Sequence, residues 1–310
     1  MLKKIFIDGS AGTTGLRIRE RLSAREDISI IQLPEEKRKD INARKEAINS
    51  ADIAFLCLPD AAAIEAVSLL NNDNTVIIDT STAHRTNPSF AYGFPELGGS
   101  FYEKIKTSKR IAVPGCHASG FIALIYPLIE KGIISEDVLL SATSLTGYSG
   151  GGKQMIADYN ENKTKLLEAP RQYGISQNHK HLPEMTYITG ISNKPAFLPI
   201  VADFYSGMEV SIPIFKEMLQ GDFGIDDIKK TYKEKYKGPV VFYKENSDEG
   251  GFLSAAAYSG KDSMEISVFG NEDRILLTAR YDNLGKGASG AAVECMNIVL
   301  GVDETKGLEI

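Results

Sequence analysis

A single cysteine stands where a helix is predicted to begin. In the segment AVPGCHASGF, Cys116 follows a Pro-Gly turn, and apolar residues with helical spacing continue from Phe121. The free backbone N–H groups and the dipole at a helix start stabilise a thiolate, so Cys116 is the candidate nucleophile. Cys57, inside the strand predicted at 52–59, and Cys295, in an apolar stripe, are instead interpreted as inert core residues.

A nucleophilic thiolate needs an acid–base partner, and the chain contains four histidines. His117 is adjacent to the cysteine, so the predicted helix directs its ring away from the thiol. His179 and His181 belong to the distant segment NHKHLPE, in which Glu184 is close enough to orient one imidazole, and which histidine acts stays open. The pair could also bind zinc, but a closed zinc site needs four ligands. Neither a CxxC nor a second histidine pair is present, so no metal is expected.

The start of the chain has the order strand, glycine turn, helix that a dinucleotide-binding fingerprint requires. KKIFIDG is followed by GSAGTTG, a GxxGxxG variant of the fingerprint, and then by LRIRERL with helical spacing. Glu35 and Glu36, after the second predicted strand, favour NAD, whereas Lys37, Arg38 and Lys39 could hold the 2′-phosphate of NADP. The motif alone leaves that choice open. The predicted cofactor contacts of the turn are Gly9, Ser10, Gly12, Thr13, Thr14 and Gly15.

Two further segments offer cations for an anionic substrate. Arg85 ends DTSTAHR, directly after the strand predicted at 74–81. Lys153 ends GYSGGGK, which resembles a P-loop but has Gln154 at the Ser/Thr position, so a flexible loop beside the cleft is expected. A nicotinamide cofactor combined with a thiolate predicts a thioester and an aldehyde linked by hydride transfer. The anion-binding candidates favour an acyl phosphate as the substrate.

The predicted elements fall into two groups along the chain. Strands at 52–59 and 74–81 with a helix between them predict an α/β Rossmann domain. From about residue 137, longer strands, among them 199–215, and a hairpin at Gly270-Asn271 predict a mostly antiparallel sheet in an α+β domain. The last apolar helix is expected to pack back on the first domain. The predicted dinucleotide-binding domain is therefore 1–115 completed by 286–310, and the catalytic domain is 116–285.

Composition narrows the class of partner and the compartment. The chain has 310 residues, 43% hydrophobic and 25% charged, with a formal net charge of −6, which disfavours nucleic acid and anionic membranes. No apolar run is long enough to span a bilayer, and no signal-peptide pattern is seen. Three widely separated cysteines fit free thiols in a reducing cytoplasm.

Seven segments, taken in order, resemble N-acetyl-γ-glutamyl-phosphate reductases of the shorter form: GSAGTTG, FLCLPD, DTSTAHR, PGCHASG, GYSGGGK, HKHLPE and DNLGKGASGAA. The resemblance covers almost the whole chain. PGC, HxHxPE and DNLGKGASGAA are specific as a set, whereas the glycine turn alone is not. The resemblance implies a Rossmann domain with a glyceraldehyde-phosphate-dehydrogenase-like catalytic domain, assembled as a dimer or tetramer.

The resemblance also implies an activity, which is NADPH-dependent reduction of N-acetyl-L-glutamyl 5-phosphate to the 5-semialdehyde in arginine biosynthesis. It resolves the cofactor as NADP. Cys116 would form the thioester, and His179 or His181 would be the acid–base. The cofactor would be lined by Gly9 to Gly15 together with Ser81, Asn283, Lys286 and Gly287.

Three alternatives remain open at this point. Aspartate-semialdehyde dehydrogenase is a relative that performs the same chemistry on a shorter acid, and a lysine-pathway reductase acts on a carrier-bound aminoadipyl phosphate. A non-catalytic NADP-binding sensor is an alternative of a different class. The sensor would need neither a cysteine at a helix start nor a distant histidine.

Overall fold

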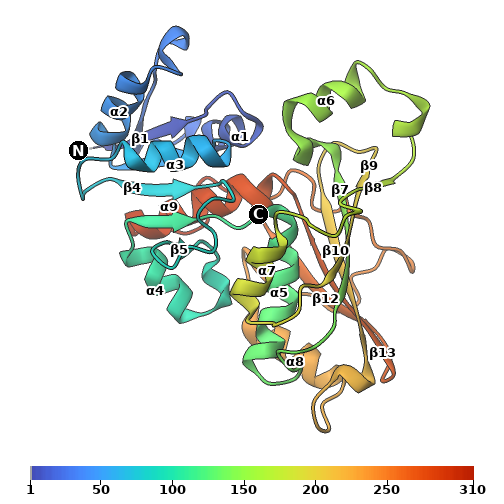
Figure 1. The fold of residues 1–310 in the computed structure, drawn as a ribbon. Helices are drawn as coiled ribbons and strands as arrows, with labels where there is room; N and C mark the ends of the chain where they lie inside the picture. The colour runs from blue at the N-terminus through green and yellow to red at the C-terminus, as the bar shows by residue number, and fades with distance from the viewer. Residues whose placement is uncertain (1) are drawn as a thin grey trace. The chain divides into compact units, whose positions relative to one another are not determined.

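The chain folds into two compact units in the computed structural model, which describes residues 2–310 (Figure 1). The first unit comprises the chain up to Gly115 together with Ala288–Leu308. The second comprises Cys116–Gly287 with the last two residues, Glu309 and Ile310. The first crossing between the units therefore falls immediately before the candidate nucleophile.

The first unit is built on a parallel sheet buried on both faces. Its strand order is β2-β1-β3-β4-β6-β5, and every described pairing is parallel. Uninterrupted apolar strands such as IAFL are typical of such a doubly covered sheet. The strands are β1 (Lys3–Asp8), β2 (Ile28–Ile31), β3 (Ile53–Leu56), β4 (Val76–Asp79), β5 (Ala91–Tyr92) and β6 (Arg110–Ala112).

Alternating strand residues feed two separate cores, one on each face of this sheet. Ile53 and Phe55 pack with residues of α1, α4 and α9, whereas Ala54 and Leu56 pack with residues of α2 and α3. The helices are α1 (Thr13–Ser23), α2 (Ile41–Ser50), α3 (Asp60–Ser68), α4 (Gly99–Thr107) and α9 (Gly290–Leu300). The Rossmann-type fold predicted for this part of the chain is confirmed.

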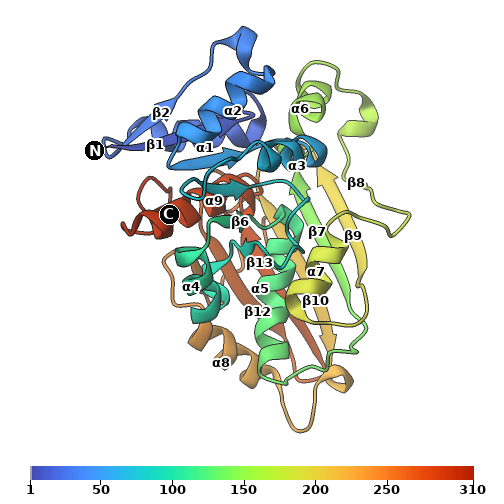
Figure 2. The same ribbon diagram turned by 60° about the vertical axis from the view of Figure 1, so that its left-hand side comes forward.

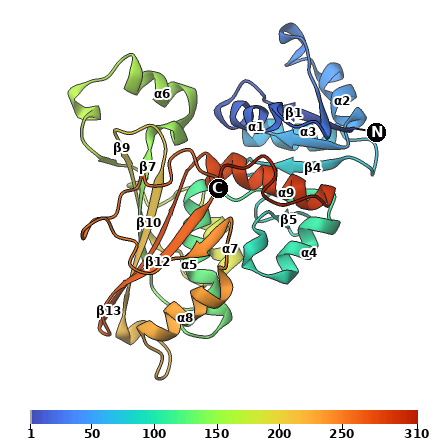
Figure 3. The same ribbon diagram turned by 180° about the vertical axis from the view of Figure 1, so that it is seen from behind.

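The last helix belongs to the first unit, as the sequence predicts. Figure 3 shows α9 beside α4. Its apolar residues, including the fully buried Cys295, complete the core that also contains β1, β3 and β4. Cys57 differs from the expectation, because β3 ends at Leu56 and Cys57 lies just after the strand. Its thiol is still unreactive, since burial raises its pKa to about 12.

The second unit contains a seven-stranded mixed sheet with the order β11-β12-β13-β10-β7-β9-β8. The pairs β11–β12 and β7–β9 are parallel and the others are antiparallel, so the mostly antiparallel sheet is confirmed. The hairpin at Gly270-Asn271 joins β12 to β13. The strands are β7 (Ser141–Gly147), β8 (Arg171–Gln172), β9 (Ala196–Ala202), β10 (Met208–Phe215), β11 (Val241–Tyr243), β12 (Met264–Gly270) and β13 (Arg274–Tyr281).

One predicted strand of this sheet is wrong. The segment 199–215 is not one strand but the end of β9, a turn, and β10. The two strands do not pair with each other, because β7 lies between them. Likewise, the glycine run at 147–153 is not a loop. It forms a tight turn over Tyr148–Gly151 and then begins α6 (Gly152–Asn160).

Helix α5 (Cys116–Glu130) packs on β10 and β13, beside α7 (Leu182–Thr189) and α8 (Ile225–Lys235) (Figure 2). Pro127 lies inside α5 and has no N–H to offer the carbonyl of Ala123, four residues earlier. The hydroxyl of Tyr236, just after α8, donates to that carbonyl at 2.7 Å. Tyr232 of α8 donates to the carbonyl of Leu124 at 2.6 Å. Two buried tyrosines therefore satisfy the helix where the proline disturbs it.

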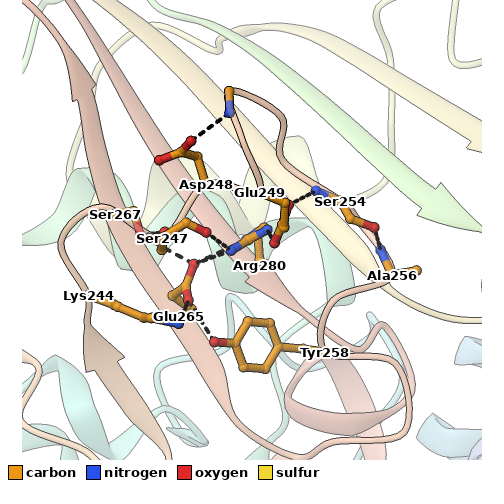
Figure 4. Close-up of polar contacts among 11 residues, drawn as sticks. Lys244, Ser247, Asp248, Glu249, Ser254, Ala256, Tyr258, Glu265, Ser267 and Arg280 are labelled. Atoms are coloured by element: carbon orange, nitrogen blue, oxygen red, sulfur yellow. Dashed lines mark hydrogen bonds and ion pairs between the residues drawn. The ribbon is translucent and has the colours of Figure 1, made fainter.

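A buried ion pair joins β12 to β13 on the face of the sheet opposite α5 (Figure 4). The Arg280 guanidinium donates from Nε and Nη2 to Glu265 Oε1, at 3.1 and 2.8 Å, and both side chains are almost fully buried. Tyr258 donates to the other oxygen of Glu265 at 2.6 Å, and Glu249 pairs with Arg280 Nη1. No helix within residues 2–310 combines the length and the apolarity needed to cross a bilayer.

We predict that Glu265→Ala lowers the free energy of unfolding by about 3 kcal/mol, because it leaves a buried guanidinium without its main counter-charge. Urea denaturation of the full chain measures this change. Lys229→Ala, which removes an exposed pairing with Asp226 in α8, should change stability by no more than about 0.5 kcal/mol. A Glu265→Ala variant as stable as Lys229→Ala would contradict the assignment.

Candidate active site

Cys116 is the first residue of α5, and a tyrosine from β13 fixes its position. The Tyr281 hydroxyl donates to the Cys116 carbonyl at 2.5 Å and accepts from the Gly120 N–H at 3.0 Å. It thus bridges two backbone groups that pair directly in a regular helix. A Cβ on Gly120 would lie 2.7 Å from that hydroxyl, so only glycine lets the helix start approach the sheet this closely. Burial raises the pKa of Tyr281 well above its usual value, which keeps this donor protonated.

The loop after β13 also closes on Cys116. A Cβ on Gly287 would lie 3.1 Å from Cys116 Cβ. The loop is held by Asp282, which accepts backbone N–H groups of Leu284 and Gly285 at 2.7 and 3.2 Å. Asn283 donates to Ser149 Oγ at 2.9 Å and accepts from the Gly207 N–H at 3.0 Å. Three residues of this loop are expected at the cofactor. Asn283 stabilises the loop, Lys286 is buried in it, and Gly287 lies against the nucleophile.

His117, His179 and His181 lie close together in the second unit, which also contains Cys116. The rings of His179 and His181 lie 4.8 Å apart, and each lies within 5.6 Å of the ring of His117. His117 Nδ1 hydrogen-bonds Ser144 Oγ of β7 at 2.7 Å, and its Nε2 hydrogen-bonds the Tyr173 hydroxyl at 2.5 Å. Both ring nitrogens of His117 are therefore engaged by structural partners. His179 and His181 precede α7, which packs on α5.

Two members of the histidine cluster, His117 and His179, are neutral at physiological pH. Burial lowers the pKa of His117 to about 3 and that of His179 to about 4, and the positive charge of Lys180 lowers both further. His179 Nδ1 accepts from the His181 backbone N–H at 3.2 Å, so the ring hydrogen of neutral His179 is carried on Nε2. His179 is consequently poised as a hydrogen-bond donor. Within residues 2–310, no group of three or more His, Cys, Asp and Glu side chains is arranged to hold a metal ion.

The first unit contains its own cavity of about 690 Å³ at the carboxyl ends of β1 and β2. Gly9, Ser10 and Gly12 of the glycine turn line it. Gly9 has φ +82°, and a Cβ there would collide with the carbonyl of Cys57, so the turn requires glycine. Gly12 precedes α1, whose first residues are Thr13, Thr14 and Gly15 and whose N-terminus has no side-chain cap. Those N–H groups are available to an anion.

Charged side chains of both signs surround the far side of this cavity. Glu35 and Glu36 line it, as do Arg38 and Lys39, whereas Lys37 does not. Arg38 lies 3.5 Å from Glu35 in an exposed pairing. A dinucleotide with a ribose phosphate fits a cavity whose turn is open to backbone approach and whose rim carries two cations.

Three predicted site residues, Ser81, Arg85 and Lys153, lie outside the groups described above. Ser81 donates to Asp79 Oδ2 at 2.7 Å, where His84 also binds. Arg85 is buried and donates to the carbonyls of Val113 and Thr80 at 2.9 Å. Lys153 is exposed in the first turn of α6.

Sequence reasoning missed three residues of the site. Tyr173 and Ser144 hold the His117 ring, and Tyr281 holds the Cys116 backbone. Their partners lie 27 to 165 residues away in the chain, and no local pattern identifies them. The sequence offered one signal. Ser144 is a polar residue at a buried position of β7, on the face toward α5, where an apolar residue would be expected.

Comparisons with known proteins cover nearly the whole chain. Residues 4–107 match the semialdehyde dehydrogenase NAD-binding domain, and residues 116–283 match the semialdehyde dehydrogenase dimerisation domain. The chain is 42% identical to N-acetyl-gamma-glutamyl-phosphate reductase 2 of Nostoc sp., over 98% of this chain and 99% of that one. It is 44% identical to the N-acetyl-gamma-glutamyl-phosphate reductase of Brucella ovis, over 97% of this chain and 100% of the other.

Solved structures of lower sequence similarity share the fold. Aspartate semialdehyde dehydrogenase II of Vibrio cholerae superposes with a TM-score of 0.74 at 16% identity, covering 97% of this chain and 99% of that one. Aspartate semialdehyde dehydrogenase of Candida albicans, solved with NADP, superposes with a TM-score of 0.69 at 14% identity over the same shares. At this identity the likeness establishes the fold alone.

We predict that His117 and His179 stay neutral from pH 8 down to about pH 5, because their pKa values of about 3 and about 4 lie far below the ordinary 6.5. The unfolded chain binds more protons over this range, so the stability that they contribute is lost as the pH falls from about 6.5 toward 4. NMR titration of the labelled imidazoles checks the prediction. A midpoint near 6.5 for either ring would show that the cluster is not desolvated.

Proposed function

The chain belongs to the N-acetyl-γ-glutamyl-phosphate reductases, and from this membership we propose that it reduces N-acetyl-L-glutamyl 5-phosphate to N-acetyl-L-glutamate 5-semialdehyde in arginine biosynthesis, with NADPH and release of phosphate. The observation that carries the proposal is a cysteine at the start of α5, in the same unit as the neutral histidines His117 and His179. A sensor that only bound a dinucleotide would need neither group.

The first half of the reaction belongs to Cys116. Its thiolate, stabilised by the start of α5, attacks the acyl carbon, and the C–O bond to phosphate breaks. Inorganic phosphate departs with the electron pair of that bond, and the acyl group remains on sulfur as a thioester. The bridge from Tyr281 keeps the Cys116 backbone in place during this exchange.

The second half returns the thiolate. NADPH, when bound, would supply the hydride that reduces the thioester carbon. His179, whose Nε2 carries a hydrogen, donates a hydrogen bond to the oxygen on which negative charge develops. The C=O bond of the aldehyde then re-forms with the electron pair of that oxygen, and the C–S bond breaks to release the aldehyde and the Cys116 thiolate. We assign this role to His179 and not to His117, because both ring nitrogens of His117 are already bonded. His181, whose ring lies 4.8 Å from that of His179, is the alternative donor.

The cavity of the first unit fits the cofactor. Gly9, Ser10 and Gly12 line it, and Thr13, Thr14 and Gly15 present the start of α1 to the pyrophosphate. Arg38 and Lys39 would hold the 2′-phosphate that distinguishes NADP from NAD. Ser81, Asn283, Lys286 and Gly287 complete the proposed cofactor contacts, and Arg85 and Lys153 the proposed substrate contacts.

A homo-oligomer in the cytoplasm is part of the same proposal. The matched dimerisation domain supports a dimer or tetramer. Leu145 of β7 and Leu198 and Ile200 of β9 are apolar but only half-buried, as expected for a face that a second copy covers. Three free cysteines fit a reducing compartment.

We predict that Cys116→Ser lowers kcat by on the order of a thousandfold or more, because serine is not ionised at neutral pH. The assay is phosphate-dependent reduction of NADP⁺ with N-acetylglutamate semialdehyde, and aspartate semialdehyde is supplied separately. Cys295→Ala, which changes a core cysteine of α9, should retain wild-type kcat. Equal rates for Cys116→Ser and the wild type would refute the nucleophile, and preference for aspartate semialdehyde would refute the substrate.

We also predict that Arg38→Gln raises the KM for NADPH roughly 10-fold, because it removes a charged contact to the 2′-phosphate, and leaves the KM for NADH unchanged. Lys45→Gln, an exposed change on α2 outside the cavity lining, is the control. Fluorescence titration with NADPH gives the affinity independently of turnover. A parallel loss with both cofactors would place Arg38 away from the phosphate.

A further inference from the structure

The segment that joins α6 to α7 contains an arginine, Arg171, without a counter-ion among residues 2–310. Arg171, on the edge strand β8, is half-buried, and its Nε atom is buried without a hydrogen-bond partner among residues 2–310. Its Nη2 donates to the neutral hydroxyl of Tyr159 at 3.1 Å, and its guanidinium lies 5.5 Å from the centre of that ring. None of the ion pairs within the described chain includes Arg171. A guanidinium whose buried Nε–H has no acceptor is unusual, because burying part of a charged group without a partner costs free energy.

The surroundings of Arg171 are continuous with the candidate active site. Tyr159, on which the guanidinium rests, packs in one small cluster with Leu167, Val201 and Tyr173. Tyr173 lies two residues after Arg171 and hydrogen-bonds His117 at 2.5 Å. Tyr173 lies just beyond β8, and its N–H donates to the Pro199 carbonyl at 2.9 Å, so the pairing with β9 continues past the strand end. Residues i and i+2 of such extended backbone share a face and lie about 7 Å apart. Arg171 therefore stands one step along the strand from the tyrosine that touches the histidine cluster.

This placement matches one end of the proposed substrate. The N-acetylglutamyl chain carries a carboxylate on C1, and its reacting carbon, C5, is four bonds away, about 5 Å in an extended chain. A planar guanidinium binds a carboxylate through two parallel N–H bonds, for which the Nε–H of Arg171 is available. The phosphate leaves from C5, at the nucleophile, so the anion that Arg171 meets is the one at the far end.

We propose that Arg171 binds the α-carboxylate of the substrate and thereby selects an N-acylated amino acid over an aldehyde without that group. The inference rests on the proposed function. Lys153, in the first turn of α6, is exposed, and its ammonium cannot bind a carboxylate through two parallel N–H bonds. We therefore assign Lys153 to the phosphate of the substrate. Arg171 acts by direct contact with the substrate and takes no part in proton or hydride transfer.

The test compares two aldehydes that differ only in the carboxylate. N-acetylglutamate semialdehyde carries it, and 4-acetamidobutanal lacks it. Arg171→Gln should lower kcat/KM for the first roughly 10- to 100-fold and leave kcat/KM for the second and the KM for phosphate unchanged. Arg171→Lys, which keeps the charge but loses the fork, should fall between the wild type and Arg171→Gln. Lys165 is an exposed cation of the same segment, and Lys165→Gln should have the wild-type kcat/KM with both aldehydes.

Two results would overturn the inference. Equal losses with both aldehydes would make Arg171 a part of the scaffold, and an increase in the KM for phosphate alone would place it at the leaving group. Calorimetric binding of N-acetylglutamate and 4-acetamidobutanoate separates this inference from the activity. If the wild type binds N-acetylglutamate more tightly and Arg171→Gln abolishes the difference, Arg171 is supported even where turnover is absent and the proposed function fails. If the wild type binds the two equally, the inference fails.

Discussion

The close approach of the start of α5 to the large sheet is the constraint on which the site depends. Gly120 and Gly287 remove the side chains that would hold the helix away, and Tyr281 fills the space with a hydroxyl that bonds to both the Cys116 carbonyl and the Gly120 N–H. The thiol is thus fixed through its backbone. The positive end of the helix dipole then acts on the sulfur atom at the first residue of α5.

Neighbouring side chains of β13 point to opposite faces of the sheet, and this places neutral hydrogen bonds on one face and an ion pair on the other. Tyr281 faces α5 and works through neutral hydrogen bonds, as do the buried histidines beside it. Arg280, the preceding residue, faces the other side and is neutralised by Glu265 and Glu249 (Figure 4). The ion pair fixes the strand from the face of the sheet away from α5. On the side of α5, His117 and His179 are uncharged, and their preorganised dipoles can act on the charge that develops during reaction.

Local sequence patterns were sufficient to predict the helices and most of the strands. They were not sufficient to predict the contacts between distant segments. The glycine turn, the start of α5 and the final helix each carry their signal within about ten residues, and the structure contains all three. The insertion of β7 between β9 and β10 has no such signal, because strand order is decided by contacts between distant segments. The same reason hid the bond between His117 and Tyr173, which are 56 residues apart. Cys57 was misplaced by one residue, which lies within the ordinary uncertainty of a strand end.

The return of α9 to the first unit has a consequence for how the chain is made. The core shared by β1, β3 and β4 includes buried residues of α9, which follow Cys116–Gly287 of the second unit in the chain. Nearly all of the second unit, Cys116–Gly287, is synthesised between the two parts of the first, and only Glu309 and Ile310 follow the second of those parts. Domains generally fold as units during synthesis, from the N-terminal side. The core of the first unit therefore cannot be completed until Cys116–Gly287 has been synthesised, and the sheet face that α9 covers stays open for that time.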